Sequence, residues 1–131
     1  MIGKLRTVVI DCPDPRALAE FYAELLGLPV TFDPDDEPSD WVVLGGPPGA
    51  MPRLAFQRAL NLRAPRWPDP QWPQQFHLDV TVGDIDEAEQ RVLKLGATRL
   101  PGQGDGFRVY ADPAGHPFCL CWDSPPGPGG S

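Results

Sequence analysis

The chain has little positive charge and no long hydrophobic run. It carries 11 Lys and Arg residues against 18 Asp and Glu residues, which gives a formal net charge of −7. Proteins that bind nucleic acid use clustered Lys and Arg to contact phosphates. No such cluster is present here, so a nucleic-acid partner is not expected. No hydrophobic run approaches the roughly 18 residues that a membrane-spanning helix requires, so a membrane partner is not expected either.

Cysteine is also scarce. The three cysteines, Cys12, Cys119 and Cys121, cannot all pair within one chain. The N-terminal stretch MIGKLRTVVIDCPDP contains acidic residues and no small-residue cleavage site, which does not fit a secretory signal peptide. These features predict a reduced, cytoplasmic protein. The length of 131 residues fits one domain, or two small modules that share one core.

Proline, by contrast, is abundant, with 18 residues that concentrate in a few stretches. They predict loops at residues 33–40, 45–52 and 59–74 and a disordered tail at residues 124–131. The first loop is acidic and is interpreted as a solvated segment. The third contains Trp67 and Trp72, and loops of this length are often functional or act as linkers.

Residues 76–98 predict a strand followed directly by an amphipathic helix. Apolar residues occupy every second position of the strand, namely Phe76, Leu78, Val80 and Val82. The residues between them are His77, Asp79 and Thr81. This alternation places the two sets on opposite faces of the strand, and the polar face must look at water or at a ligand. Asp84 is placed to cap the helix N-terminus, and Gly96 is placed to end the helix.

The first half of the chain shows the same order of elements. A strand is predicted at residues 5–12, followed by a helix at residues 16–26 that Asp14 caps and Gly27 ends. Further strands of the first half are predicted at residues 30–32, 41–44 and 53–58. In the second half, the strands after the helix are predicted near residues 99–100 and at residues 107–111 and 117–122. A shift of 70 residues lays residues 8–14 onto 78–84. Such a repeat implies paired modules around a shared concavity.

Two turns are predicted in the second half. Residues 101–106 are rich in glycine, and residues 112–115, with the sequence DPAG, have the proline and glycine that favour a β-turn. His116, directly after the second turn, is expected to be exposed to solvent. Cys12 is expected in the core, on the helix-facing side of its strand.

The predicted fold is α+β, with two βαβββ modules that form a curved mixed sheet. The helices are expected on the convex side and a cavity on the concave side. The expected modules are residues 1–60 and 76–123, joined by a Trp- and Pro-rich linker loop at 61–75 and followed by the tail at 124–131.

Three stretches of this sequence resemble the vicinal oxygen chelate superfamily, which includes glyoxalase I, extradiol dioxygenases and bleomycin-resistance proteins. They are DPRALAEFYAELLGL, HLDVTVGDIDEAEQRVLKLGA and DPAGHPFCL. The similarity covers most of residues 5–122 and is strongest to a glyoxalase-like subgroup. It implies a cavity that binds a small molecule, and it implies a homodimer in which modules pair within one chain or are swapped between chains.

In metal-dependent members of this superfamily, the ligands come from the first and last strands of each module. Carried over by position, these sites fall on Thr7 and a position near Gln57 in the first half, and on His77 and Cys119 in the second. The carboxylate usual at the last position is absent. A divalent Ni, Fe or Mn site needs several imidazole or carboxylate ligands, and His77 with Cys119 and Asp79 would instead suggest Zn. No metal is therefore expected; if one is bound, its ligands would be His77, Gln57 and Cys119.

The candidate ligand-binding residues are Thr7, Val9, Gln57, His77, Asp79 and Cys119, with Trp67 or Trp72 near the entrance. His77 is the candidate catalytic residue, because an imidazole can act as a general base or donate a hydrogen bond to an anionic or carbonyl ligand. The cysteines can equally be small apolar wall residues, and the tryptophans can equally pack against their own module or form a dimer contact.

Three functions follow from these observations. The first is a small-molecule-binding protein with an incomplete metal site, comparable to the drug-sequestering members of the superfamily. The alternative is a metal-dependent lyase, isomerase or dioxygenase that uses His77 and Gln57. The third is a structural, dimer-forming domain without a pocket function.

Overall fold

The computed structural model describes residues 2–34, 39–47, 50–73 and 76–123. The chain divides into two compact units, residues 1–63 and 64–131. The acidic residues 35–37 of the first predicted loop, Gln74 of the third loop and the predicted tail at 124–131 lie outside the described residues. Over the described part of the chain, no helix is both long and apolar enough to cross a membrane.

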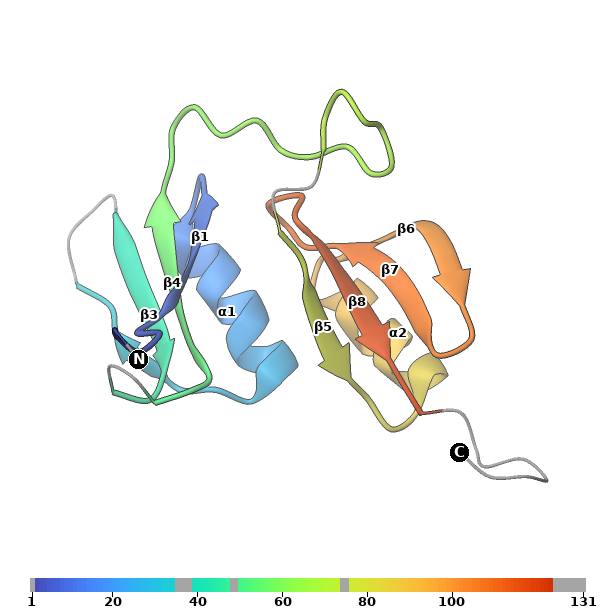
Figure 1. Cartoon of the computed structure of the whole chain (residues 1–131), viewed down its shortest axis with the longest axis horizontal. Helices are drawn as coiled ribbons and strands as arrows, with labels where there is room; N and C mark the ends of the chain where they lie inside the picture. The colour runs from blue at the N-terminus through green and yellow to red at the C-terminus, as the bar shows by residue number, and fades with distance from the viewer. Residues whose placement is uncertain (1, 35–38, 48–49, 74–75, 124–131) are drawn as a thin grey trace. The chain divides into compact units, whose positions relative to one another are not determined.

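The first unit has one helix and a four-stranded mixed sheet (Figure 1). Its elements are β1 (Val8–Cys12), α1 (Pro15–Leu26), β2 (Val30–Phe32), β3 (Trp41–Gly45) and β4 (Arg53–Arg58). The strand order is β1-β4-β3-β2, with β1 parallel to β4 and the other neighbours antiparallel. The sheet therefore brings the first and last strands of the unit side by side.

Helix α1 forms as its end signals predict. The Asp14 side chain accepts a hydrogen bond from the Ala17 N–H at 3.3 Å, and Gly27 ends the helix in the left-handed conformation with φ 66°. Its apolar stripe is buried against the sheet, where the Tyr22 ring stacks on Phe56 with 5.7 Å between ring centroids. Cys12 is fully buried, as predicted.

The second unit repeats this arrangement. Its elements are β5 (Leu78–Thr81), α2 (Ile85–Lys94), β6 (Thr98–Gly104), β7 (Phe107–Ala111) and β8 (Pro117–Cys121). The strand order is β5-β8-β7-β6, again with a parallel pair formed by the first and last strands. The α+β class and the duplicated βαβββ order are thus confirmed, and over the described residues the strands form two four-stranded sheets that do not close into a barrel.

A polar network fastens α2 to its sheet. The Tyr110 hydroxyl on β7 donates a hydrogen bond to Glu89 Oε1 at 2.8 Å, and Arg99 and Arg108 form ion pairs with the same carboxylate. The hydrogen bond from Tyr110, together with the two guanidinium groups, lowers the pKa of Glu89, while burial raises the pKa of Tyr110 to about 12. The network fixes which face of β7 lies toward the helix, so Phe107 and Val109 belong to the opposite face.

The predicted glycine-rich turn at residues 101–106 is wrong in most of its length, because β6 continues to Gly104. Between the pairs Arg99–Tyr110 and Gln103–Arg108, β6 has two residues more than β7, so the register shifts there. Pro101, which has no N–H to donate, lies in this irregularity. Proline and glycine therefore mark a bulge in a strand rather than its end.

The prediction that His116 is exposed is also wrong, since only 1% of its surface is accessible. Its N–H donates to the Asp112 side chain at 3.0 Å, and its ring lies 5.0 Å from that of Phe76. A Cβ added at Gly115 would come within 2.9 Å of the Ala64 side chain, so the segment before β5 covers this turn. The burial depends on residues far away in the sequence, which the turn signal does not reveal.

Replacing Asp112 tests this turn. One of its carboxylate oxygens accepts hydrogen bonds from the N–H groups of Ala114 and His116, and Asp112 is itself buried. We expect Asp112→Ala to lower the free energy of unfolding by about 2–3 kcal/mol, because one buried and one partly buried N–H donor lose their acceptor. Asp112→Asn keeps one acceptor oxygen and should cost clearly less. Urea unfolding measures both variants, and equal losses would contradict this account of the turn.

Candidate functional site

Each sheet has one face that its helix covers and one face that it does not, which is called here the helix-free face. In the second unit, the candidate residues lie on the helix-free face. On β8, Phe118 and Leu120 are fully buried, and Cys119 between them projects from the other face. Cys119 pairs with Asp79 across the parallel β5–β8 ladder and with Val109 across β7–β8. Sheet register thus groups residues that are distant in the sequence on one surface.

A pocket of about 370 Å³ lies on this helix-free face. Its lining includes Trp67, His77, Gln103, Phe107, Val109 and Cys119. Trp67 comes from the loop before β5, and its indole N–H donates to the Pro101 carbonyl at 2.5 Å, which attaches the loop to the bulge in β6. The wall is mainly apolar and has a few polar groups, which is typical of a small-molecule site.

His77 is one of the polar residues that line this pocket, and Asp79 lies beside it. His77 Nε2 lies 3.5 Å from Asp79 Oδ1, and the two side chains are 42% and 63% exposed. His77 therefore does not lie beneath α2 but at an accessible position, next to a carboxylate that can orient the imidazole. Such an imidazole can form a hydrogen bond to a ligand or accept a proton from it.

Cys119 is a neutral wall residue of the pocket. Burial raises the pKa of its thiol to about 11, and the negative charge of Asp79 adds to the shift. The pKa of Cys121 is raised for the same two reasons. A nucleophile must be a thiolate, so the environment of Cys119 disfavours that role.

The residues present do not fit the divalent metal that the superfamily resemblance implies. Across residues 2–34, 39–47, 50–73 and 76–123, no group of three His, Cys, Asp or Glu side chains is arranged to hold a metal ion. His77 and Asp79 are neighbours, but within the described ranges no third ligand converges on them.

The remaining predicted residues of the sheets belong to the first unit. Thr7 lies just before β1, and its hydroxyl accepts a hydrogen bond from Arg53 Nε at 2.8 Å. Val9 is 44% exposed, and Gln57 on β4 is exposed. Thr7, Val9 and Gln57 share a face with Arg53 by strand alternation and register. None of these three residues belongs to the lining of the pocket at His77.

The strand registers correct one detail of the predicted site. Asp79 pairs with Cys119, and its repeat equivalent Val9 pairs with Ala55. The counterpart of Cys119 in the first unit is therefore Ala55, and Gln57 corresponds instead to Cys121. An alanine offers no metal ligand at this position.

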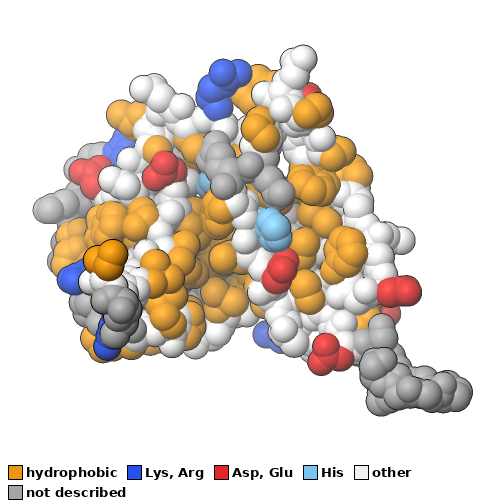
Figure 2. All heavy atoms as spheres, in the orientation of Figure 1, with side chains coloured by type: hydrophobic (Ala, Val, Ile, Leu, Met, Phe, Trp, Pro, Cys, Tyr) orange, Lys and Arg blue, Asp and Glu red, His pale blue; other side chains and the backbone are white. Residues whose placement is uncertain are grey.

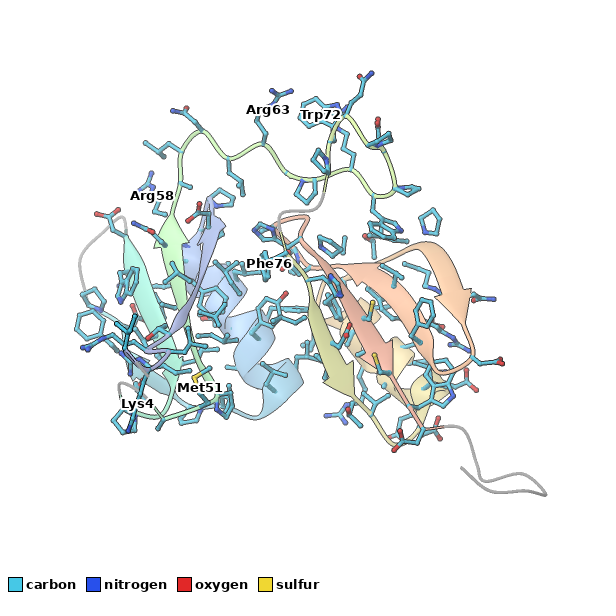
Figure 3. The ribbon with its side chains drawn as sticks, in the orientation of Figure 1. Lys4, Met51, Arg58, Arg63, Trp72 and Phe76 are labelled. Atoms are coloured by element: carbon cyan, nitrogen blue, oxygen red, sulfur yellow. The ribbon has the colours of Figure 1, made fainter. Side chains whose placement is uncertain are left out.

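The two tryptophans of the long loop have different surroundings. Trp67 lines the pocket, whereas Trp72 (labelled in Figure 3) does not belong to its lining. The Arg66 guanidinium lies over the Trp72 ring, 4.1 Å from its centroid. The sequence did not single out Gln103, Phe107 and Val109 as lining residues. The alternation of apolar residues in FRVYA could have indicated Phe107 and Val109, but Gln103 was placed in a turn.

Comparisons with known proteins give a consistent result. Residues 7–121 match a family model described as a glyoxalase-like domain. No curated protein sequence matches the chain significantly.

Several solved structures share the fold. A glyoxalase/bleomycin resistance protein/dioxygenase family enzyme from Burkholderia phytofirmans is 17% identical, with a TM-score of 0.67 over 92% of this chain and 98% of that one. A fosfomycin resistance protein from Mesorhizobium loti is 15% identical, with a TM-score of 0.68 over 95% and 94%. The trypanothione-dependent glyoxalase I of Leishmania major is 20% identical, with a TM-score of 0.64 over 91% and 86%.

The raised pKa of Cys119 can be tested by alkylation. At pH 9 a thiol with a pKa of about 11 is about 1% ionised, whereas one with the ordinary value of 9.0 is half ionised. We expect iodoacetamide to modify Cys119 about 50-fold more slowly in the folded protein than in urea, and the difference to shrink as the pH rises toward 11. Peptide mapping by mass spectrometry gives the rates. Equal rates at pH 9 would show that the thiol is not shifted.

Proposed function

Because the chain belongs to the glyoxalase-like domain family of the vicinal oxygen chelate superfamily, we propose that it binds a small organic molecule on the helix-free face of the second unit, without a resident metal. The observation that carries this proposal is the pocket in which His77 supplies a polar contact and Trp67, Phe107 and Val109 supply an apolar wall. An aromatic or apolar molecule with a hydroxyl or carbonyl group matches this lining.

The chemistry of the donors supports binding without a metal. Thr7 is engaged by Arg53, and the repeat counterpart of Cys119 is Ala55. Of the superfamily's imidazole, amide and carboxylate ligands, only His77 stays at a ligand position. Gln57 is exposed, and the register makes it the counterpart of Cys121 instead. The alternative, a metal-dependent lyase, isomerase or dioxygenase, requires those two residues to hold the ion with ligands from elsewhere. Formation of a homodimer, which the resemblance implies, stays a prediction.

Elemental analysis distinguishes the two functions. Protein purified without added metal should contain no stoichiometric Zn, Ni, Fe or Mn, because the described residues offer no converging ligand set. A chelator should leave the thermal unfolding temperature unchanged. Bound metal that disappears in His77→Ala would instead support the metal-dependent enzyme and exclude this proposal.

The pocket itself is tested with 1-naphthol, an uncharged aromatic alcohol. We expect a saturable shift of the Trp67 indole N–H resonance, assigned from Trp67→Phe, because this ring lines the pocket. His77→Ala should weaken binding by about two- to tenfold through the loss of one hydrogen bond. Thr81→Ala is the matched control, since Thr81 is exposed at the end of β5, the strand that His77 directly precedes, and does not line the pocket. An unmoved Trp67 signal, or equal effects of the two variants, would refute the proposal.

A further inference from the structure

The first unit contains a pocket of its own, of about 630 Å³. Phe32, Trp41 and Val43, on the neighbouring strands β2 and β3, form an apolar wall, and Arg53 lies where the β3–β4 turn enters β4. Figure 2 shows hydrophobic side chains exposed over the strands of this unit, and Phe32 is 52% exposed. The size and lining are in the range found for small-molecule sites.

Arg53 is held in a fixed orientation at the end of this wall. Its Nε donates to the Thr7 hydroxyl at 2.8 Å, and its Nη1 donates to the Gly46 carbonyl at 2.7 Å. The two acceptors belong to different segments, the one before β1 and the β3–β4 turn. The two hydrogen bonds therefore fix the orientation of the guanidinium plane. Nη2 donates to no described residue and is available to a ligand.

The β3–β4 turn owes its shape to Gly45. Its φ is 98°, and a Cβ at this position would lie 2.2 Å from the Pro52 carbonyl oxygen. Only glycine allows this close approach. The turn brings the Gly46 carbonyl to Arg53 and leaves no side chain at Gly45 and Gly46, which both line the pocket beside the guanidinium.

The positive charge of Arg53 is not neutralised by any described residue. Both of its acceptors are uncharged, and Arg53 takes part in no ion pair within the described ranges, whereas Arg16 on α1 pairs with Asp33 at 2.8 Å. A partly buried guanidinium with neutral neighbours attracts an anion, and its planar donors match a carboxylate.

We infer that the pocket of the first unit binds an aromatic or apolar monocarboxylate, with the carboxylate on Arg53 and the apolar body against Trp41 and Phe32. The inference rests on the pocket lining, the fixed guanidinium and the absence of a paired carboxylate among the described residues. It does not depend on the ligand proposed for the second unit.

A matched pair of probes tests this inference on the full chain. 1-Naphthaleneacetate and the uncharged 1-naphthaleneacetamide have nearly the same shape, so their difference in affinity reports the charge. Isothermal titration calorimetry should show the acid binding about tenfold more tightly than the amide, because a charged hydrogen bond replaces a neutral one. The acid should also shift the Trp41 indole resonance, assigned from Trp41→Phe.

Variants locate the contact. Arg53→Gln should remove the preference for the acid and leave amide binding unchanged. Lys4→Gln, which makes the same change in net charge at an exposed position of the same unit, should preserve the preference. If Arg53→Gln fails to fold, Thr7→Val, which frees Nε and loosens the guanidinium, should reduce the preference about threefold.

The outcomes separate the two proposals. Equal affinity for acid and amide, no binding of either probe, or an unchanged preference in Arg53→Gln would overturn the inference. The same holds if the acid shifts the Trp67 indole and not that of Trp41, because the anion would then bind in the second unit. If 1-naphthol does not shift the Trp67 resonance, the function proposed for the second unit fails, but the inference about Arg53 in the first unit is unaffected.

Discussion

The structure depends on the fact that each four-stranded sheet has a single helix of its own. A helix about 10 Å wide can cover one face of such a sheet and no more. In both units the covered face is filled by stacked rings, Tyr22 on Phe56 and Tyr110 on Phe118, at centroid distances of 5.7 and 5.6 Å. Packing thus constrains the helix side, and the helix-free side can carry polar chemistry at less cost in stability.

The local parts of this arrangement could be predicted from the sequence. The predicted strands at residues 53–58 and 107–111 match β4 and β7 to the residue, and the caps at Asp14 and Asp84 located both helices. These signals are local because each depends on backbone geometry within a few residues. The burial of His116 could not be predicted, because it depends on Ala64 and Phe76, which are far away in the sequence. The extension of β6 past Pro101 could not be predicted either, because it depends on pairing with β7.

The candidate site shows the same division. The predicted alternation placed His77 and Asp79 side by side, although β5 itself begins at Leu78. The pairing of Cys119 with Asp79 follows once β5 and β8 are parallel neighbours. Trp67 was expected near the entrance on composition alone, and its place beside Pro101 required the fold. Arg53 was missed because its environment joins three segments: its own strand, Thr7 46 residues earlier and Gly46 in the preceding turn. No short motif encodes such a site.

The two helix-free faces differ in electrostatic character although the scaffold is duplicated. The face of the second unit has Asp79 beside an imidazole and a thiol, which disfavours a bound anion, whereas the face of the first unit has a guanidinium among neutral acceptors. The formal net charge of −7 does not oppose an anion there. Exposed charges are screened beyond about 8–10 Å at physiological salt, while a direct contact with a fixed guanidinium is not. The two proposed sites can therefore differ in chemistry although the fold is duplicated, because the residues that hold the helix lie on the face opposite to the one proposed to meet a ligand.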